Sequence, residues 1–452
     1  MAKSTDALDP ITFEVLRSFF EYTCQRMSTM LELTAFSPVL VDMVDFSNAI
    51  YDADLRLVSQ AANCPVHLAS MHFSARASVD QFGRDNIEPG DVIVMNDPYQ
   101  GGTHIPDVAF TTPIYFDGEL LGFAVNRAHW TDLGGGAAGG YGFGAHVAGE
   151  GLRLPPVKLF RRGKIDDQLR RLLLANSRTP QYIEGDIMGH MAALGAAEQE
   201  LCQAARRYGV ALLRGAMART IDYTERLTRK AITDIPDGSY EATDYVDTDG
   251  FSETPIRIRV EITVAGDSLS VDFTGTDPIA KGGCNSPYAN TYSAVYYSLK
   301  FYLSPEAPAN AGMYAPIDII LPEGCFLNAV WPAPTIACTT LTSSKITSVI
   351  WQALSQALPE QVAAPTFAEA NAFILSTTHP ETGDTHVFAD LPAGGWGGTP
   401  RGDGMNATMD PLGNCLNLPA EVAELQHPVV YEAFELNPDS GGAGRARGGV
   451  GT

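Results

Sequence analysis

The sequence predicts a multidomain protein of the mixed α and β (α+β) class, with antiparallel strands, long packing helices and a second β-rich domain. Its 452 residues suffice for two or three domains, each with a buried core. Apolar residues recur at helical spacing in some segments and alternate with polar residues in others. We expect an α/β region over residues 1–160, a helical segment over 161–235 and a β-rich mixed domain over 236–452, with glycine-rich loops in the last.

The first region is expected to begin with a helix and a hairpin. An Asp-Pro pair at 9–10 is typical of a helix N-terminus, and the apolar residues after it recur at helical spacing. Two strands, Phe46–Tyr51 and Leu55–Ser59, follow around an Asp-Ala-Asp turn. Pro65 opens a second helix, which Gly83 ends.

Three further strands form the centre of this region. They are expected at Val92–Met95, Val108–Phe116 and Leu120–Asn126. The last two are joined by the dipeptide Asp117-Gly118, and such a dipeptide between two apolar runs is a strong hairpin signal. The polar, glycine-rich turn before the second strand therefore lies close to the end of the third.

This hairpin brings Asp107 and His129 together. A two-residue loop would place residue 107 opposite residue 128, and a three-residue loop would place it opposite residue 129. His104 lies three residues before Asp107, and Pro106 holds the connection extended. Two imidazoles and a carboxylate suit a divalent metal ion that keeps open positions for water or substrate. The alternative is a loop histidine, a turn aspartate and a strand-end histidine that never meet.

Asp45 and the glycine-rich segment 134–151 have roles that the pattern leaves open. Asp45 stands before the first strand of the N-terminal hairpin, where it is either a strand-end cap or a further metal ligand. The segment 134–151 is too rich in glycine to fold on its own. It is either a lid or substrate loop above His129, or a flexible connector.

The rest of the chain is expected to contain long helices and then a second antiparallel sheet. Helical segments are predicted at 166–178, Pro180–Tyr208 and Ala211–Ala231. After a turn at 236–238, the predicted strands are Tyr240–Tyr245, Thr254–Val264 and Ser268–Phe273, and the predicted helices are Asn285–Tyr302 and Ser343–Leu358. A glycine-rich loop starting at Gly394 lies between weaker strands. The closing LNPDSGGAGRARGGVGT is either an anion-binding segment or, more simply, a frayed tail.

Composition narrows the functional classes. A net charge of -23 speaks against nucleic acid or an anionic membrane as a partner. The chain has no run of about 18 apolar residues, and its first residues lack the apolar core of a signal peptide, so we expect a cytoplasmic protein. No phosphate-binding Gly-x-x-x-x-Gly-Lys-Ser/Thr loop and no Gly-x-Ser-x-Gly motif occur.

The seven cysteines are scattered, without a Cys-x-x-Cys pair. This pattern indicates neither a disulfide framework nor a thiolate zinc site, so reduced and mostly buried thiols are expected. Cys284, flanked by glycines and polar residues, is the one candidate nucleophile, although a small buried residue is the commoner case in such a setting.

Several long motifs resemble the hydantoinase B/5-oxoprolinase family. They are NDPYQGGTHIPDV, RAHWTDLGG, EGLRLPPVKL, LLANSRTP, DFSNAIYDADLRLVSQ, PVHLASM and DSGGAGRARGG. The resemblance covers nearly the whole chain and implies a divalent metal, zinc or manganese, bound by His104, Asp107 and His129, often with Asp45. It also implies that Asp132 and Glu150 are candidates for relaying protons.

The resemblance further implies that this chain is one half of an enzyme. In the family the ATP site, with its magnesium, lies on a hydantoinase A-type partner that phosphorylates the substrate. We therefore expect a hetero-oligomer that opens a cyclic amide such as a hydantoin, a lactam or 5-oxoproline. One alternative is a subunit of an ATP-dependent acetone or acetophenone carboxylase, acting on a ketone, and another is a scaffold without catalytic residues.

Two departures from the family pattern limit what is carried over. The site histidine is followed by Trp130 where another histidine is frequent, and VDMV precedes Asp45 where many hydantoinase-type members have basic residues. Because of these two departures, the resemblance does not indicate which substrate the chain acts on. Family members also usually continue beyond the DSGGAGRARGG motif, so we expect that a C-terminal piece is missing here.

Overall fold

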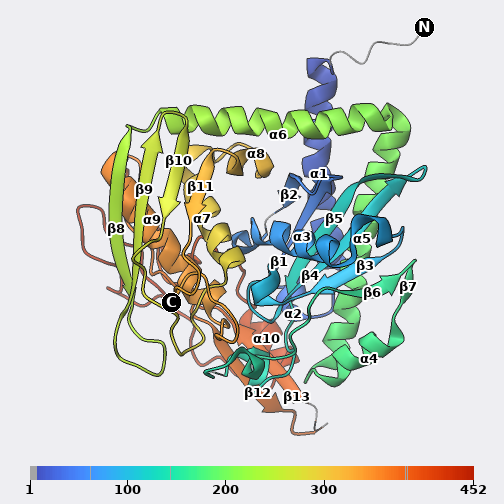
Figure 1. The fold of residues 1–452 in the computed structure, drawn as a ribbon. Coiled ribbons are helices and arrows are strands. Elements are labelled where there is room, and N and C mark those ends of the chain that lie inside the picture. The colour runs from blue at the N-terminus through green and yellow to red at the C-terminus, as the bar shows by residue number, and fades with distance from the viewer. Residues whose placement is uncertain (1–7, 62, 143, 382, 384) are drawn as a thin grey trace.

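A seven-stranded antiparallel sheet forms the centre of the first half of the chain (Figure 1). The computed structural model describes residues 8–61, 63–142, 144–381, 383 and 385–452. The strands lie in the order β2-β1-β5-β4-β3-β6-β7. Their bounds are β1 (Phe46–Asp52), β2 (Leu57–Ala61), β3 (Val92–Met95), β4 (Asp107–Phe116), β5 (Glu119–His129), β6 (Val157–Arg161) and β7 (Lys164–Ile165).

Helices cover both faces of this sheet. On one face α1 (Pro10–Thr34) and α5 (Pro180–Tyr208) pack against β1, β4 and β5, and α3 (Ser70–Phe82) covers the other face. The Asp9 side chain caps α1 as predicted. The helix predicted from Pro65 is instead a short 3₁₀ turn followed by α3. The reason is that two backbone N–H groups in this stretch donate to distant partners rather than to a preceding turn.

The β4–β5 hairpin pairs Asp107 directly with His129. Its loop is the two-residue turn at 117–118, with both residues at positive φ. The expectation that such a loop pairs residue 107 with residue 128 is wrong because β5 contains a one-residue bulge at Leu121. The bulge shifts the rest of the ladder by one residue, so the register beyond it is that of a longer loop.

A second, four-stranded sheet lies in the other half of the chain, in the order β11-β10-β9-β8. The three predicted strands are confirmed as β8 (Gly238–Val246), β9 (Ile256–Ala265) and β10 (Ser268–Asp272), all antiparallel. A fourth, β11 (Ile317–Ile320), was not predicted and pairs parallel with β10. The helices of this half are α7 (Tyr288–Leu303), α8 (Ala311–Tyr314) and α9 (Ser343–Ala357), and α9 packs on β8 and β9.

The long helix α6 (Val210–Thr233) runs across the top of the molecule and joins the two halves (Figure 1). One hydrophobic core extends from Leu16 to Ile221 and unites the first sheet with α1, α5 and α6. A second core surrounds the four-stranded sheet, α7 and α9. Two short helices complete the first half, α2 (Pro38–Val41) and α4 (Asp167–Ala175).

The last part of the chain includes the elements at the bottom of Figure 1, and its end lies beside the four-stranded sheet. It contains the hairpin β12 (Phe373–Thr378) and β13 (Thr385–Asp390), and the helix α10 (Ala420–Gln426). Both weaker strands precede the loop that starts at Gly394, so the prediction that they flank it is wrong. The prediction of a frayed tail is also wrong, since backbone groups of residues 447–452 bond to residues 393–407.

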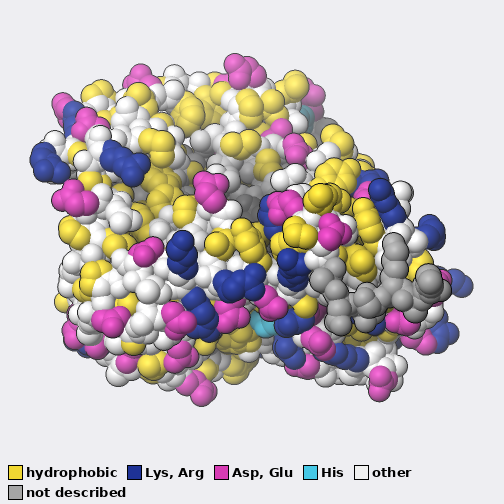
Figure 2. Space-filling model, turned by 90° about the horizontal axis from the view of Figure 1, so that it is seen from above, with side chains coloured by type: hydrophobic (Ala, Val, Ile, Leu, Met, Phe, Trp, Pro, Cys, Tyr) yellow, Lys and Arg dark blue, Asp and Glu magenta, His cyan; other side chains and the backbone are white. Residues whose placement is uncertain are grey.

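Charged side chains of both signs are mixed on the surface. On the face in Figure 2, Lys and Arg side chains lie among Asp and Glu side chains. Among the described helices, none combines the length and apolar character that a bilayer crossing requires. The helices and antiparallel sheets together confirm the predicted mixed α and β class.

Candidate metal centre

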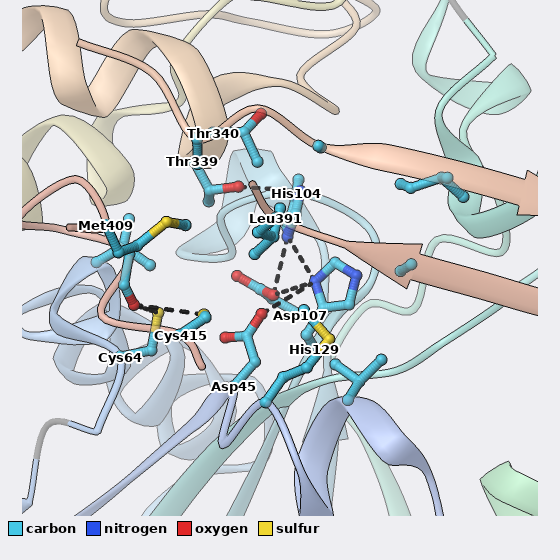
Figure 3. Close-up of a pocket in the computed structure, with 18 of the residues that line it drawn as sticks. Asp45, Cys64, His104, Asp107, His129, Thr339, Thr340, Leu391, Met409 and Cys415 are labelled. Carbon is cyan, nitrogen blue, oxygen red and sulfur yellow. Dashed lines mark hydrogen bonds and ion pairs between the residues drawn. The ribbon is translucent and has the colours of Figure 1, made fainter. Parts of the chain in front are cut away.

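Three predicted ligands converge where β4 and β5 meet a glycine-rich turn (Figure 3). Asp107 begins β4, His129 ends β5, and the two are directly paired. His104 lies in the turn before β4. At the start of this turn Gly101 has φ 100°, and a Cβ on it would lie 2.6 Å from the backbone of Phe73. The turn takes this path because glycine tolerates both the positive φ and the close backbone contact.

The ligand atoms lie close together. His104 Nε2 is 2.9 Å from Asp107 Oδ1, and His129 Nδ1 is 3.2 Å from each of these two atoms. Ligand atoms about 2.1 Å from a tetrahedral ion are roughly 3.4 Å apart, so the three atoms already have nearly the spacing that zinc requires.

The hydrogen bonding of His104 supports this interpretation. Its Nδ1 lies 2.8 Å from the carbonyl oxygen of Ile336, which can only accept, so the proton is on Nδ1. In the neutral ring Nε2 is then a bare acceptor facing the carboxylate and His129. Such acceptors repel one another unless a proton or a cation lies between them. A histidine whose far nitrogen donates to a carbonyl is typical of metal ligands, so the residues present fit a divalent ion.

The charges at the site favour an ionised aspartate. Burial opposes ionisation, yet His104 and His67 together hold the pKa of Asp107 well below its ordinary value. Burial likewise opposes protonation of His104, but Asp107 outweighs it and raises the pKa of this histidine. The space between His104 and Asp107 therefore favours a positive charge.

A cavity of about 60 Å³ adjoins these side chains. It exceeds the roughly 15 Å³ that one water needs. Most of its other walls are apolar: Val39, Met43, Ile374, Ala389, Leu391 and Met409. Tyr141 of the glycine-rich segment also lines it, with its ring edge-on to His104 at 6.3 Å. This contact favours the interpretation of that segment as a substrate loop rather than a connector.

Asp45 lies at the edge of the cluster. Its Oδ2 is 4.0 Å from His129 Nδ1, and its backbone oxygen accepts a hydrogen bond from the His129 N–H. The Asp45 side chain therefore lies just outside the group formed by His104, Asp107 and His129. Its role as a fourth ligand stays a prediction.

Asp132 does not line the cavity. It is fully buried and accepts hydrogen bonds from the backbone of Gly134 and Gly139 and from Arg178. These contacts tie the glycine-rich segment to the start of α5. They fit a structural role rather than the expected proton relay.

Glu150 is also outside the cavity lining. Its Oε1 accepts hydrogen bonds from the backbone N–H groups of Thr335 and Ile336, at 2.6 and 2.9 Å. Burial raises its pKa to about 8. The carboxyl group thus holds the segment whose carbonyl oxygen orients His104, and it acts on the site through that segment.

Two polar residues beside Asp107 were not predicted. Thr103 Oγ1 donates to Asp107 Oδ2 at 2.6 Å, and His67 Nε2 lies 3.3 Å from the same oxygen. His67 is 1% exposed and lines the cavity. A signal was present, since Cys64-Pro-Val-His67 puts a thiol and an imidazole three residues apart at a turn.

The cysteines are free, as predicted. Cys284 is buried, and burial raises its pKa to about 12. Of the two interpretations of Cys284, this environment fits a small core residue rather than a nucleophile. Cys64 and Cys415, in contrast, both line the cavity. No signal in the sequence indicated this, because residues 64 and 415 are far apart in the chain.

Comparison with known proteins gives matches along nearly the whole chain. The hydantoinase B/oxoprolinase family profile matches residues 9–452. The beta subunit of the caprolactamase of Pseudomonas jessenii is 33% identical over 462 residues, which cover 99% of this chain and 78% of that protein. The B-type subunit of a putative D-/L-hydantoinase of Pseudomonas sp. (strain NS671) is 29% identical over 461 residues, which cover 98% of this chain and 77% of that protein.

Solved structures show the same fold. The crystal structure of the ATP-dependent caprolactamase from Pseudomonas jessenii superposes with a TM-score of 0.92 and 33% identity, covering 98% of this chain and 78% of that chain. The nucleotide-free acetone carboxylase structure superposes with a TM-score of 0.88 and 19% identity. The match covers 98% of this chain and 61% of that chain. At this identity the second likeness concerns the fold alone.

Proposed function

We propose that this chain, which belongs to the hydantoinase B/oxoprolinase family, is the metal-bearing subunit of an ATP-dependent enzyme that hydrolyses a cyclic amide. The substrate is a lactam, a hydantoin or 5-oxoproline. A hydantoinase A-type partner binds ATP and Mg²⁺ and activates the substrate by phosphorylation. The working enzyme is a hetero-oligomer of the two.

One observation carries the proposal. His104, Asp107 and His129 converge at a cavity, in a chain that is 33% identical to a caprolactamase subunit along nearly its whole length. The relative's name supplies the class of reaction, and the cluster supplies a place for its chemistry. The apolar walls suit the methylene groups of a ring whose amide faces the polar cluster.

The residues divide the work as follows. His104, Asp107 and His129, with Asp45, would hold Zn²⁺ or Mn²⁺, and the ion would supply Lewis acidity toward an oxygen of the substrate. Thr103 and His67 fix the Asp107 carboxylate. The Ile336 carbonyl fixes the orientation of His104. Tyr141 and the apolar walls exclude bulk water from the reacting amide.

The test is substrate-dependent ATP hydrolysis by this chain together with its A-type partner. ADP and the ring-opened product should form together from caprolactam, hydantoin or 5-oxoproline, without bicarbonate. His104→Ala and His129→Ala should each lower ring opening by more than about 100-fold. The matched control is His379→Ala, since His379 follows β12 and lies outside both the cavity lining and the glycine-rich segment 134–151.

Two results would overturn the proposal. A requirement for bicarbonate, with a ketone as substrate, would make the chain a carboxylase subunit. Full activity of an intact complex carrying His104→Ala or His129→Ala would make it a scaffold. Elemental analysis of the wild type beside His104→Ala and Asp107→Ala tests the metal separately. Zinc or manganese should be present in the wild type and depleted in both variants.

A further inference from the structure

A second group of metal-ligating side chains adjoins the first. The thiols of Cys64 and Cys415 and one carboxylate oxygen of Asp45 lie within 4.8 Å of one another. Both cysteines line the same cavity as His104 and His129. Figure 3 shows Asp45 between the thiols and the histidines.

The chain holds the two thiols in place by contacts between distant segments. The N–H of Val66 donates to the carbonyl of Leu412, and the N–H of Leu416 donates to the carbonyl of Met43. The Asn414 side chain adds a bond to the carbonyl of residue 63 at 2.9 Å. The segment 412–416 is therefore fastened on both sides of Cys415, and the position of the thiol pair is defined.

Among the described residues, the two thiols share one weak hydrogen-bond acceptor, and Cys64 Sγ also lies 3.7 Å from the carbonyl oxygen of Leu412. Cys64 Sγ lies 3.0 Å and Cys415 Sγ 3.4 Å from the carbonyl oxygen of Gly413. A thiol is a poor hydrogen-bond donor, so this shared acceptor satisfies the pair only weakly. Structural cysteines are ordinarily surrounded by apolar groups, whereas these two face a carboxylate across a cavity.

From this arrangement we propose a second metal site, in which Cys64, Cys415 and Asp45 bind a thiophilic divalent cation such as Zn²⁺. Two sulfur ligands and one oxygen ligand select zinc over manganese, magnesium or calcium. Three protein ligands leave a fourth position open toward the cavity. Asp45 lies between both groups and would bridge the two ions.

The charges of the cavity are balanced when two ions are bound. A metal-bound thiol gives up its proton. With both thiols so bound, the cavity holds two thiolates and the carboxylates of Asp45 and Asp107. Two divalent cations balance these four negative charges, just as one cation balances the two carboxylates while both thiols keep their protons.

The experiment is titration of the full metal-free chain with Co²⁺ under a phosphine reductant. Cobalt takes the place of zinc and shows sulfur ligation through an intense charge-transfer band in the near ultraviolet. We expect about two equivalents of bound cobalt, one of them accompanied by this band. The wild-type result alone tests the proposal, whether or not the variants fold.

Variants then separate the two sites. Cys64→Ser and Cys415→Ser should each abolish the band and release one equivalent. His104→Ala should release the other equivalent and keep the band. Cys202→Ser is the matched control, since Cys202 bonds to the carbonyl of Tyr115 and lies outside the cavity lining.

Each contrary outcome is distinct. Cobalt binding without a charge-transfer band would overturn the thiol site and leave the proposed function untouched. A single equivalent lost in both the cysteine and the His104 variants would mean that one ion spans both groups, which also overturns the second site. A Cys64–Cys415 disulfide that persists in the reductant would overturn it as well.

Discussion

At the scale of single residues, Asp107 uses its two oxygens for different contacts. Oδ1 faces His104 and His129, and Oδ2 is held by Thr103 and His67. A carboxylate held in this way offers a single oxygen to a cation in a fixed direction. Partners of this kind are what set the affinity of a metal site beyond its direct ligands.

Thr103→Val should therefore weaken metal binding by about 10- to 100-fold. Valine has nearly the shape of threonine but lacks the hydroxyl that donates to Asp107 Oδ2, so the carboxylate is free to rotate. The measurement is the dissociation constant for Mn²⁺. Thr103→Ser restores the hydroxyl and should bind within a few-fold of the wild type; equal weakening in both variants would contradict the hydrogen-bond explanation.

Glu150 illustrates a residue that acts through its neighbours. Oε1 accepts both backbone N–H groups of residues 335–336, and Oε2 is 3.4 Å from the Thr335 hydroxyl. These hydrogen bonds favour the ionised carboxylate, but burial outweighs them and favours the protonated group.

Stability should fall with pH because of this group. Burial raises the pKa of Glu150 from 4.5 to about 8, so the folded chain binds the proton more tightly than the unfolded chain. Its contribution is complete below about pH 4.5 and is lost as pH rises toward 8, by up to roughly 1.4 kcal/mol per pH unit.

The measurement is urea unfolding of the metal-free chain at several pH values. Glu150→Gln keeps an accepting oxygen toward both N–H groups and has no proton to lose. Its stability should change less with pH than that of the wild type in this range. Parallel curves for the two proteins would show that Glu150 is ionised in the fold.

At the scale of elements, the β4–β5 hairpin and the turn before β4 determine the site. The Leu121 bulge brings His129 opposite Asp107, and Gly101 allows the turn to pass close to α3. A substitution could alter the bulge or the turn without disrupting β4 and β5 themselves.

Two glycines with similar φ allow the effect of backbone strain to be distinguished from the effect of steric overlap. Gly101 has φ 100° and Gly118 has φ 84°, but a Cβ on Gly118 meets nothing within 4 Å. Gly118→Ala should cost about 1–2 kcal/mol of stability and leave metal binding intact. Gly101→Ala should cost a further 1–3 kcal/mol or so from overlap with Phe73, and weaken metal binding as well.

Urea unfolding and Mn²⁺ titration of both variants check this prediction. The Gly118 variant serves as the control for backbone strain alone. Equal effects of the two substitutions on metal binding would show that the turn before β4 does not position His104.

At the scale of the whole molecule, the cavity joins parts of the chain that are distant in sequence. Its walls come from the first sheet, from the π-helical turn Cys338–Thr342 before α9, from the β12–β13 hairpin and from the segment 409–415. A ligand in this cavity contacts both halves. Binding should therefore stabilise the molecule as a whole.

Mn²⁺ at 100 times its dissociation constant should stabilise the fold by about 2.7 kcal/mol and raise the melting temperature by a few degrees. Manganese is chosen because thiolates bind it weakly. His104→Ala should remove the shift. A shift of the same size in that variant would place the stabilising manganese elsewhere on the chain.

The sequence alone determined the long helices, most strands, the mixed α and β class and the proximity of His104, Asp107 and His129. These follow from periodicity, turn dipeptides and short spacings, which report local burial and local geometry. Only the tertiary structure decided the direct pairing through the Leu121 bulge, the parallel strand β11 and the ordered tail. It also decided the contact of Cys64 with Cys415 and the bond from His104 to Ile336. Such features depend on how distant segments pack, and no local pattern encodes the partner of a side chain hundreds of residues away.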